Sequence, residues 1–125
     1  METWLFFKMD AGDIFNRGDS IPRVVILTYE DTGLPLDLDT LTEITFAVIH
    51  AVTGRTLNTY TLSGATIIKQ DAGNGIAWFD VGQSISALAK LGKYFIRVTS
   101  TEADGDYESG VHVRKGLGFC FKLQS

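Results

Sequence analysis

Cysteine is almost absent from this chain of 125 residues, which contains Cys120 alone. A single thiol cannot close a disulfide within the chain. Cys120 alternates with Phe119 and Phe121 in a strand-like run, and a free cysteine in such a run usually packs as a small apolar residue. The sequence therefore predicts a buried or half-buried strand residue at this position and not a reactive thiol.

The chain also lacks a surplus of positive charge and a long apolar run. Eleven Lys and Arg against fifteen Asp and Glu give a net charge of −4, which provides no broad basic field for nucleic acid. The N-terminal segment has Glu2 at its start, no basic residues before its apolar run, and too few apolar residues for a signal sequence or a membrane span. We therefore expect synthesis in a cytoplasm, with neither nucleic acid nor membrane as a partner.

Residues that carry catalysis or bind metals are few and scattered. His50 and His112 are each isolated among strand residues, without the neighbouring His, Cys or carboxylates that a zinc site needs. Four carboxylates could in principle supply a catalytic pair: Glu43, Asp80, Glu102 and Glu108. Nothing in the sequence places two of them at the separation that glycoside chemistry requires. We predict no enzymatic activity, no metal and no cofactor.

Two acidic loops and a late basic cluster have plain structural explanations. The loops Asp71–Gly75 and Asp104–Asp106 bring oxygen ligands together but do not fit the calcium-loop pattern, so they are interpreted as turns. The basic residues in the last third of the chain are Lys93, Arg97, Arg114, Lys115 and Lys122. They predict a modest basic patch, which is more often a solvated sheet face than a binding site.

Length and composition favour one β-rich domain. A chain of this length can bury one real core and is too short for two ordinary domains. Apolar residues make up 45% of the chain, and thirteen Gly and eight Phe indicate a globular protein with many tight turns.

The segment from Ile85 to Ser100 combines a helical turn with a strand. Ile85, Leu88 and Leu91 recur every third residue, which predicts the apolar edge of a short helix that Gly92 ends. From Tyr94 the period becomes two, so Tyr94, Ile96 and Val98 are expected on one face of a central strand.

Strands are expected at regular intervals before this segment. The run 21–29 is dense in apolar and β-branched residues and is interpreted as a strand covered on both faces. In 44–50, Ile44, Phe46, Val48 and His50 share one face. Further strands are expected at 55–62, 65–70 and 76–81, with turns at Gly54, Gly64 and Gly75, in the rhythm of a β-meander.

Two strands are expected after it, at 107–114 and 117–124, with a turn at Lys115-Gly116. In the last one, the alternation places Leu117, Phe119, Phe121 and Leu123 on one face, which is interpreted as the core face. Short strands punctuated about every ten residues, with one crossover helix, match an antiparallel sandwich.

Several turn motifs and one strand tyrosine follow one another in a particular order. They are Arg17-Gly18-Asp19-Ser20, then a strand, Asp31-Thr32-Gly33-Leu34-Pro35-Leu36-Asp37-Leu38, Ile44–His50, Gly54, Gly75-x-x-x-Phe79, and Leu91-Gly92-Lys93-Tyr94. This order, over roughly residues 14–123, resembles the immunoglobulin-like N-terminal domain of phage baseplate upper proteins. Related domains occur in other tail, fibre and virion proteins.

The resemblance implies an all-β fold, an immunoglobulin-like antiparallel β-sandwich with one short crossover helix, over residues 14–125. It also implies a virion protein, made in the cytoplasm of the host bacterium, that docks on neighbouring virion proteins and commonly occurs in symmetric copies. The family supplies no catalytic residues. Because the chain stops after this domain and begins with an additional aromatic segment, we expect a small accessory or adaptor protein of a tail, baseplate, fibre or capsid.

Residues 1–13 precede the predicted domain and contain Trp4, Leu5, Phe6 and Phe7. A monomer rarely leaves so large an aromatic patch in water. The segment is therefore interpreted as an arm that packs on a neighbouring subunit or another virion protein, or as the first strand of its own sandwich. Both arrangements stay open at this stage.

A carbohydrate-binding module or adhesin is the competing function, with a glycan as its partner. Such a module needs exposed aromatic rings on a sheet face or loop. The residues that could form this platform are Trp4, Tyr60, Trp78 and Tyr107.

Overall fold

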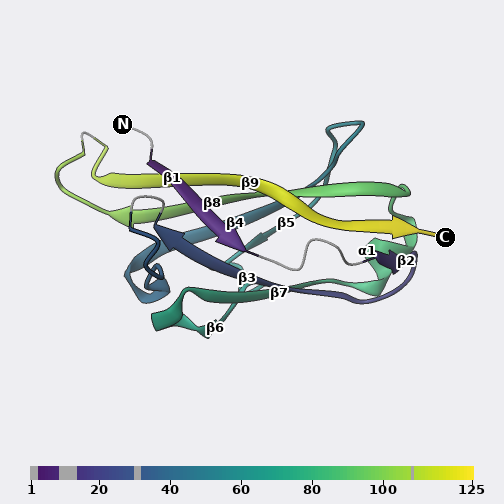
Figure 1. Ribbon diagram of the computed structural model, residues 1–125, viewed down its shortest axis with the longest axis horizontal. Helices are drawn as coiled ribbons and strands as arrows, with labels where there is room; N and C mark the ends of the chain where they lie inside the picture. Colours follow the sequence, from purple (N-terminus) through teal and green to yellow (C-terminus); the bar gives the residue numbers. More distant parts are fainter. Residues whose placement is uncertain (1–2, 9–13, 30–31, 108) are drawn as a thin grey trace.

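The computed structural model describes residues 3–8, 14–29, 32–107 and 109–125, and of residues 3–8 it describes the backbone alone. The strands are β1 (Thr3–Lys8), β2 (Ile14–Asn16), β3 (Ile21–Tyr29), β4 (Leu41–His50), β5 (Thr56–Thr61), β6 (Ile68–Asp71), β7 (Ile76–Val81), β8 (Gly92–Ala103) and β9 (Val111–Gln124). The helical segments are η1 (Leu38–Thr40), η2 (Ala72–Asn74) and α1 (Gln83–Leu88). Figure 1 shows the strands in two stacked layers, with α1 at the end where the C-terminus lies.

The hydrogen-bonded path of strands folds over at β1 and so produces the two layers. One layer has the order β5-β4-β8-β9, and the other has the order β1-β3-β7-β6. The start of β1 pairs parallel with β9, and the rest of β1 pairs antiparallel with β3. These are the strand orders of an immunoglobulin-type domain, in which strands A, B, E and D face strands G, F, C and C′. The predicted all-β, immunoglobulin-like sandwich with one short helix is confirmed.

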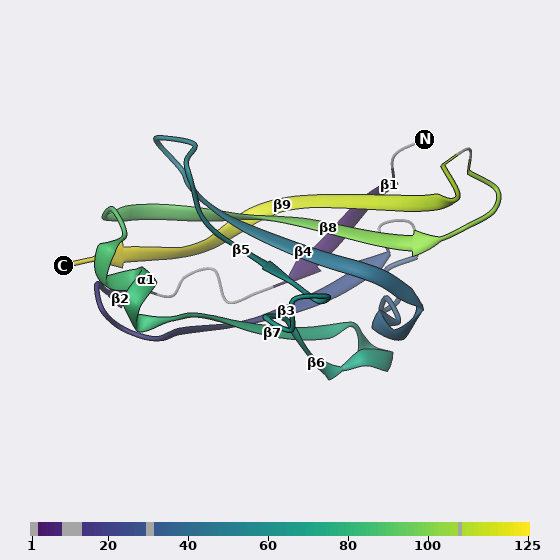
Figure 2. The same ribbon diagram turned by 180° about the vertical axis from the view of Figure 1, so that it is seen from behind.

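The core lies between the layers and is rich in aromatic rings. The ring of Phe79 on β7 lies 5.2 Å from that of Phe46 on β4 and 4.8 Å from that of Tyr60 on β5, measured between centroids. Figure 2 shows these strands from behind, with β4 and β5 above β7. Each fully buried large apolar side chain contributes about 1.5–3 kcal/mol to the free energy of folding by leaving water. The contacts of Phe79 with Phe46 and Tyr60 therefore stabilise the packing of the two layers.

The alternation of buried and exposed side chains along β4 and β8 agrees with the prediction from the sequence. Ile44, Phe46, Val48 and His50 are buried on β4, as predicted, and so are Tyr94, Ile96 and Val98 on β8. Strand β8 lies between β4 and β9, which confirms its central position.

The prediction that the strand at 21–29 is covered on both faces is wrong. Ile21, Val25 and Leu27 of β3 are buried, but Val24 is 41% exposed. Three outward residues of β3, Pro22, Val24 and Ile26, are apolar although they contact solvent. The apolar run therefore signals an unusual outer surface and not a doubly covered strand.

The predicted β-meander is also wrong. Strands β4 and β5 form a hairpin in one layer, whereas β6 and β7 form a hairpin in the other. The chain crosses between layers after Thr61, where the carbonyl of Thr61 accepts hydrogen bonds from the N–H groups of Thr66 and Ile67. The strand expected at 65–70 is correspondingly short and begins only at Ile68.

The crossover helix exists but uses different residues as its inner face. Leu88 is 91% exposed and Leu91 is 38% exposed, so the predicted apolar edge holds only at Ile85, which packs against the core. Ser86 is buried instead, and its hydroxyl accepts a 2.7 Å hydrogen bond from the N–H of Gly18. The helix ends at Leu88, before Gly92.

The last two predicted strands are one continuous strand, β9, with no turn at Lys115-Gly116. Gly116 and Gly118 lie opposite Val98 and Ile96 of β8, where the absence of side chains leaves room for these larger inward residues. The glycines therefore serve packing between strands and do not mark a turn.

The predicted core face of the last strand is correct at Phe121 and Leu123 and wrong at Leu117 and Phe119. Phe121 pairs with Tyr94, but Phe119 pairs with the next residue, Phe95, so Cys120 is an extra residue in β9. Such a β-bulge shifts the alternation by one residue. Phe121 and Leu123 consequently face the core, whereas Leu117 is 61% exposed on the outer face.

The aromatic N-terminal segment lies along its own sandwich as β1. The backbone of Trp4 pairs with Lys115 of β9, and the backbone of Leu5 to Phe7 pairs with β3. This is the second of the two arrangements that the sequence left open. The side chains of Trp4, Leu5, Phe6 and Phe7 lie outside the described residues, so their proposed contact with a partner stays a prediction.

Candidate docking surface

The outer surface of β4, β8 and β9 combines apolar and cationic side chains. We call it the cationic face. It is made of Ala47, Ile49, Lys93, Phe95, Arg97, Lys115, Leu117, Phe119 and Lys122. All of these residues are partly or fully exposed.

A cross-strand row of three large apolar residues lies within the cationic face. Ile49 of β4 pairs with Phe95 of β8, which pairs in turn with Phe119 of β9. The rings of Phe95 and Phe119 meet edge to face, with centroids 6.0 Å apart. The bulge at Cys120 builds this row, because without the shift Phe119 would face the core with Phe121.

Four cations surround the row. Lys93 lies directly opposite Lys122 on the neighbouring strand, and like charges in that position destabilise a sheet. The Nζ atom of Lys93 lies 5.9 Å from the centre of the Phe119 ring, which gives a modest cation–π attraction. Positive charge is thus concentrated on one surface of a chain whose net charge is −4.

Arg114 belongs to a different environment, so the predicted basic patch holds for four of its five residues. The guanidinium of Arg114 is buried in the sandwich, donates a 2.8 Å hydrogen bond to Glu102 Oε2 and lies 5.0 Å from the centre of the Tyr29 ring. This partly buried ion pair serves packing and adds nothing to the cationic face.

The opposite outer surface, on β3, β7 and β6, has its own apolar row. We call it the tryptophan face. It is made of Pro22, Val24, Ile26, Ile68, Asp71, Ile76, Trp78 and Asp80. Val24 pairs with Trp78, which pairs with Ile68, so again three large apolar residues lie in line across three strands. Val24 is 41% exposed and Ile68 is 53% exposed.

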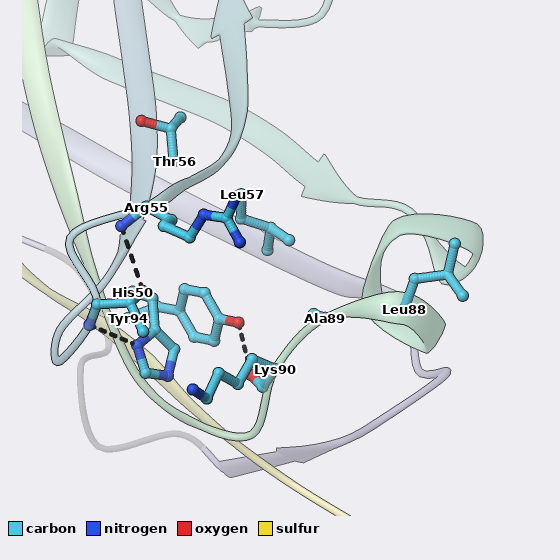
Figure 3. Close-up of a pocket in the computed structure, with 9 residues that line it drawn as sticks. His50, Arg55, Thr56, Leu57, Leu88, Ala89, Lys90 and Tyr94 are labelled. Carbon is cyan, nitrogen blue, oxygen red and sulfur yellow. Dashed lines mark hydrogen bonds between the residues drawn. The ribbon is translucent and has the colours of Figure 1, made fainter.

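A pocket of about 370 Å³ opens between the β4–β5 hairpin and the connection from α1 to β8 (Figure 3). His50 joins these two segments. Its Nδ1 atom accepts from the N–H groups of Val52 and Thr53, at 3.3 and 3.2 Å, so the proton lies on Nε2, which donates to the Leu91 carbonyl at 3.0 Å. The histidine is therefore a structural strand residue, as the sequence predicted.

Two exposed cations, Arg55 and Lys90, line this pocket, and its lining contains neither a carboxylate nor a cysteine. Tyr94 closes the floor, with its hydroxyl hydrogen-bonded to the Lys90 carbonyl (Figure 3). Both ring nitrogens of the histidine are engaged by backbone groups, so among the residues that line the pocket there is no histidine, carboxylate or thiol free to act as a general base.

The four carboxylates considered from the sequence have separate structural surroundings. Oε1 of Glu43 accepts hydrogen bonds from the N–H groups of Ile44, Leu62 and Ser63, at 2.9 to 3.0 Å. Glu102 is paired with Arg114, and Asp80 lies on the tryptophan face beside Pro22. Glu108 lies outside the described residues. The described carboxylates therefore do not form the pair that glycoside chemistry needs.

The remaining titratable candidates are buried, which suppresses their charged forms. Burial, with a smaller contribution from Arg114, lowers the pKa of His112, whose ring stacks on Tyr107 with centroids 4.5 Å apart. Burial raises the pKa of the Cys120 thiol to about 12, against a weaker opposing effect of Arg23. A thiol with this pKa is almost entirely protonated near neutral pH and is a poor nucleophile. The prediction of a buried strand cysteine is confirmed.

The two acidic loops are turns, as predicted. Asn74 donates a 2.9 Å hydrogen bond to Asp71, and the N–H of Asp106 donates to Asp104 at 3.0 Å. Within the described part of the chain, no three His, Cys, Asp or Glu residues are grouped as metal ligands. In the same part, no helix is long and apolar enough to cross a membrane.

The aromatic residues proposed as a glycan platform do not gather on one surface. Tyr60 is buried, Trp78 lies on the tryptophan face, and Tyr107 lies in the loop between β8 and β9. The side chain of Trp4 is outside the described residues. The three described rings therefore do not form a shared platform.

Comparison with known proteins supports the fold. No family model and no curated protein sequence matches the chain. A solved structure of murine CRIg, an immunoglobulin-like domain, is similar with a TM-score of 0.54 and 8% identity, over 97% of this chain and 98% of that one. At this level of identity the likeness shows that the chain is an immunoglobulin-like β-sandwich and says nothing about what it binds.

Sequence reasoning missed both outer faces as surfaces. It assigned Leu117 and Phe119 to the core and treated the apolar outward residues of β3 as covered. The signal was present for β3, since Val24, Ile26 and Trp78 are apolar at positions that strict alternation assigns to solvent. The signal was absent for β9, because the extra residue of a bulge cannot be seen from alternation alone.

Proposed function

We propose that the protein is a non-enzymatic structural protein of a phage virion, which docks on neighbouring virion proteins through its cationic face. The observation that carries the docking role is the exposed row of Ile49, Phe95 and Phe119 with four cations around it. Interfaces typically have such an apolar centre with a polar rim, and aromatic residues and arginine are enriched in them. The virion context comes from the resemblance of the turn motifs to phage baseplate domains.

The described chemistry favours binding over catalysis. The pocket residue His50 is engaged by backbone groups, Cys120 is buried, and Glu43 and Glu102 have separate partners. The hydrogen bond from Tyr94 to the Lys90 carbonyl and the two-layer core hold the strands of the cationic face in place. A rigid sheet face with a fixed charge pattern is suited to a repeated contact in an assembly.

Genomic context tests the virion role. Genes for capsid, portal or tail proteins beside the gene for this chain would support it, and a position inside a metabolic operon would overturn it.

Purified particles then allow a direct test by mass spectrometry. We expect the wild-type chain in the particle and a strong loss of incorporation for the doubly substituted chain Arg97→Glu with Leu117→Glu.

The control reverses one positive charge at a site outside the cationic face. Lys90→Glu reverses an exposed cation at the pocket, outside the cationic face, and should be incorporated like the wild type. Equal incorporation of all three chains would contradict the role of the cationic face. Thermal melts of the purified variants would verify that each is folded.

A further inference from the structure

We propose that copies of this chain stack on one another, with the cationic face of one copy against the tryptophan face of the next. The inference rests on the proposed docking role of the cationic face and assigns its partner as a second copy of the same chain. It requires two different surfaces on each copy, so the contact is head-to-tail and not two-fold symmetric.

The apolar parts of the two faces match in form. Each has one row of three large apolar residues across three strands, Ile49–Phe95–Phe119 on one side and Val24–Trp78–Ile68 on the other. Both rows are partly exposed in the isolated chain, and monomeric proteins seldom leave two such surfaces in water. Two sheets can pack face to face through rows of this kind, as the two layers of the sandwich do.

The charges on the two faces are complementary. The cationic face has Lys93, Arg97, Lys115 and Lys122. The two acidic residues on its strands have other partners, since Oε1 of Glu43 accepts from three backbone N–H groups and Glu102 pairs with Arg114. The outward residues of β3, β7 and β6 on the tryptophan face include Asp71 and Asp80 but no lysine or arginine, whereas Lys8 of the neighbouring strand β1 pairs with Ile26 at the border of this face. Opposite charges around two apolar rows favour one face of each kind in the contact.

A symmetric contact between two cationic faces is disfavoured by the same charges. It would bring the four cations of one copy against the same four of the other, and like charges in a contact cost several kcal/mol. The opposed pair of Lys93 and Lys122 already places two cations side by side within one copy. A carboxylate from a neighbour would relieve this repulsion, whereas a second cationic face would increase it.

A head-to-tail contact either closes into a ring or extends as a filament. Each copy in the series contributes one face of each kind, so both faces of every copy are covered except at an open end, where one face is left uncovered. This arrangement provides repeated copies without any additional subunit. It therefore explains how a domain of this size could occur in the symmetric copies expected of a virion protein.

Complementation between two variants tests the head-to-tail geometry. The first variant has Arg97→Glu with Leu117→Glu and so lacks a working cationic face. The second has Val24→Lys with Ile68→Lys and so lacks a working tryptophan face. The side chains at all four positions are exposed in the folded chain, so both variants should fold. Thermal melts of the two variants check that they do. Sedimentation velocity then measures each chain alone and in an equimolar mixture.

We expect the wild type to form species larger than a dimer as its concentration rises, and added salt to reduce them by screening the charges. Each variant alone should remain monomeric. The mixture should give a heterodimer and stop there, because only one productive pair of faces remains. A wild type that stops at a dimer, or variants that do not complement each other, would overturn the head-to-tail contact.

A second measurement covers the case in which a variant does not fold. Chains carrying Leu117→Cys and chains carrying Ile68→Cys are mixed and treated with a bifunctional maleimide, while Cys120 is protected by burial. Cross-linking between the two kinds of chain supports the stack, and its absence counts against it. A wild type that is monomeric throughout would overturn the stack alone, since docking on other virion proteins is measured separately by particle incorporation of the Arg97→Glu, Leu117→Glu chain.

Discussion

The hydroxyl of Tyr94 donates a 2.5 Å hydrogen bond to the carbonyl oxygen of Lys90, four residues earlier. Immunoglobulin-type domains have such a tyrosine corner near the start of strand F, two residues before a disulfide cysteine. Here the residue two positions later is Ile96, which is buried. The ring of Tyr94 stacks on Phe121 of the neighbouring strand β9 with centroids 5.0 Å apart. The apolar side chain of Ile96 thus occupies the position that the cysteine of strand F has in antibody domains.

Replacing this tyrosine by phenylalanine isolates the hydrogen bond from the ring. Tyr94→Phe keeps the stack on Phe121 but removes the donor to Lys90. We expect a loss of about 1 kcal/mol in the free energy of unfolding, the usual net value of one hydrogen bond, and a melting temperature lower by about 3–5 °C. Tyr107→Phe is the control, because the Tyr107 ring stacks on His112 and a phenylalanine ring keeps this contact. Equal melting temperatures for Tyr94→Phe and wild type would refute the stabilising role of the corner.

The bulge at Cys120 makes two phenylalanines of the same strand differ in their contribution to stability. Phe121 is fully buried and also meets Phe15 edge to face, so Phe121→Ala should cost about 3–5 kcal/mol, as for other buried aromatics. Phe119 is partly exposed beside Phe95, and Phe119→Ala should cost clearly less. Urea unfolding of both variants measures the difference. A larger cost at Phe119 would contradict the bulge and restore simple alternation.

Periodicity sufficed for the strands whose inner and outer faces differ in composition. Ile44, Phe46 and Val48 on β4 alternate with smaller or polar residues, and Tyr94, Ile96 and Val98 on β8 alternate in the same way apart from Phe95, so the buried face could be predicted. The assignment of layers could not. A hairpin within one sheet and a crossing between sheets have similar lengths and similar turn residues, and only the packing of the whole chain distinguishes them.

The candidate surface was less accessible to prediction than the fold. Four of its cations were recognised in the sequence as a basic patch, but Phe119 and Leu117 were assigned to the core. The reason is physical: one inserted residue reverses every later side chain of a strand, and the hydrophobicity of Phe119 is the same on either side. Exposure of an aromatic row is a property of the folded chain and not of its composition.

Gly75 provides a local test of the turn chemistry. Its φ is +71°, and a Cβ there would lie 2.4 Å from the carbonyl oxygen of Leu27 and 3.0 Å from that of Leu36. Since both contacts are with backbone atoms, Gly75→Ala should destabilise the domain by more than about 1 kcal/mol. Gly73 in the same turn has nothing within 4 Å of such a Cβ and is the matched control. Similar melting temperatures for the two alanine variants would show that the turn adapts.

Glu43 makes the stability of the fold depend on pH. Burial tends to raise its pKa, but the hydrogen bonds from Ser63, Ile44 and Leu62 together outweigh burial, so its pKa in the folded chain is lowered. A carboxyl with a lowered folded pKa stabilises the fold above its unfolded pKa of about 4.3. That stabilisation is lost as the pH falls through the folded pKa, because the unfolded chain then binds the proton first.

The comparison of wild type with Glu43→Gln separates this group from the other carboxylates. Glutamine can still accept from the three N–H groups but does not titrate, so its Oε1 keeps the geometry without the charge. We expect the wild type to be more stable than Glu43→Gln at pH 7, and the difference to shrink as the pH is lowered below about 4.3. Urea unfolding at a series of pH values measures it. A difference that stays constant from pH 7 down into the acid range would mean that the charge of Glu43 contributes nothing, and that the three hydrogen bonds act only through their geometry.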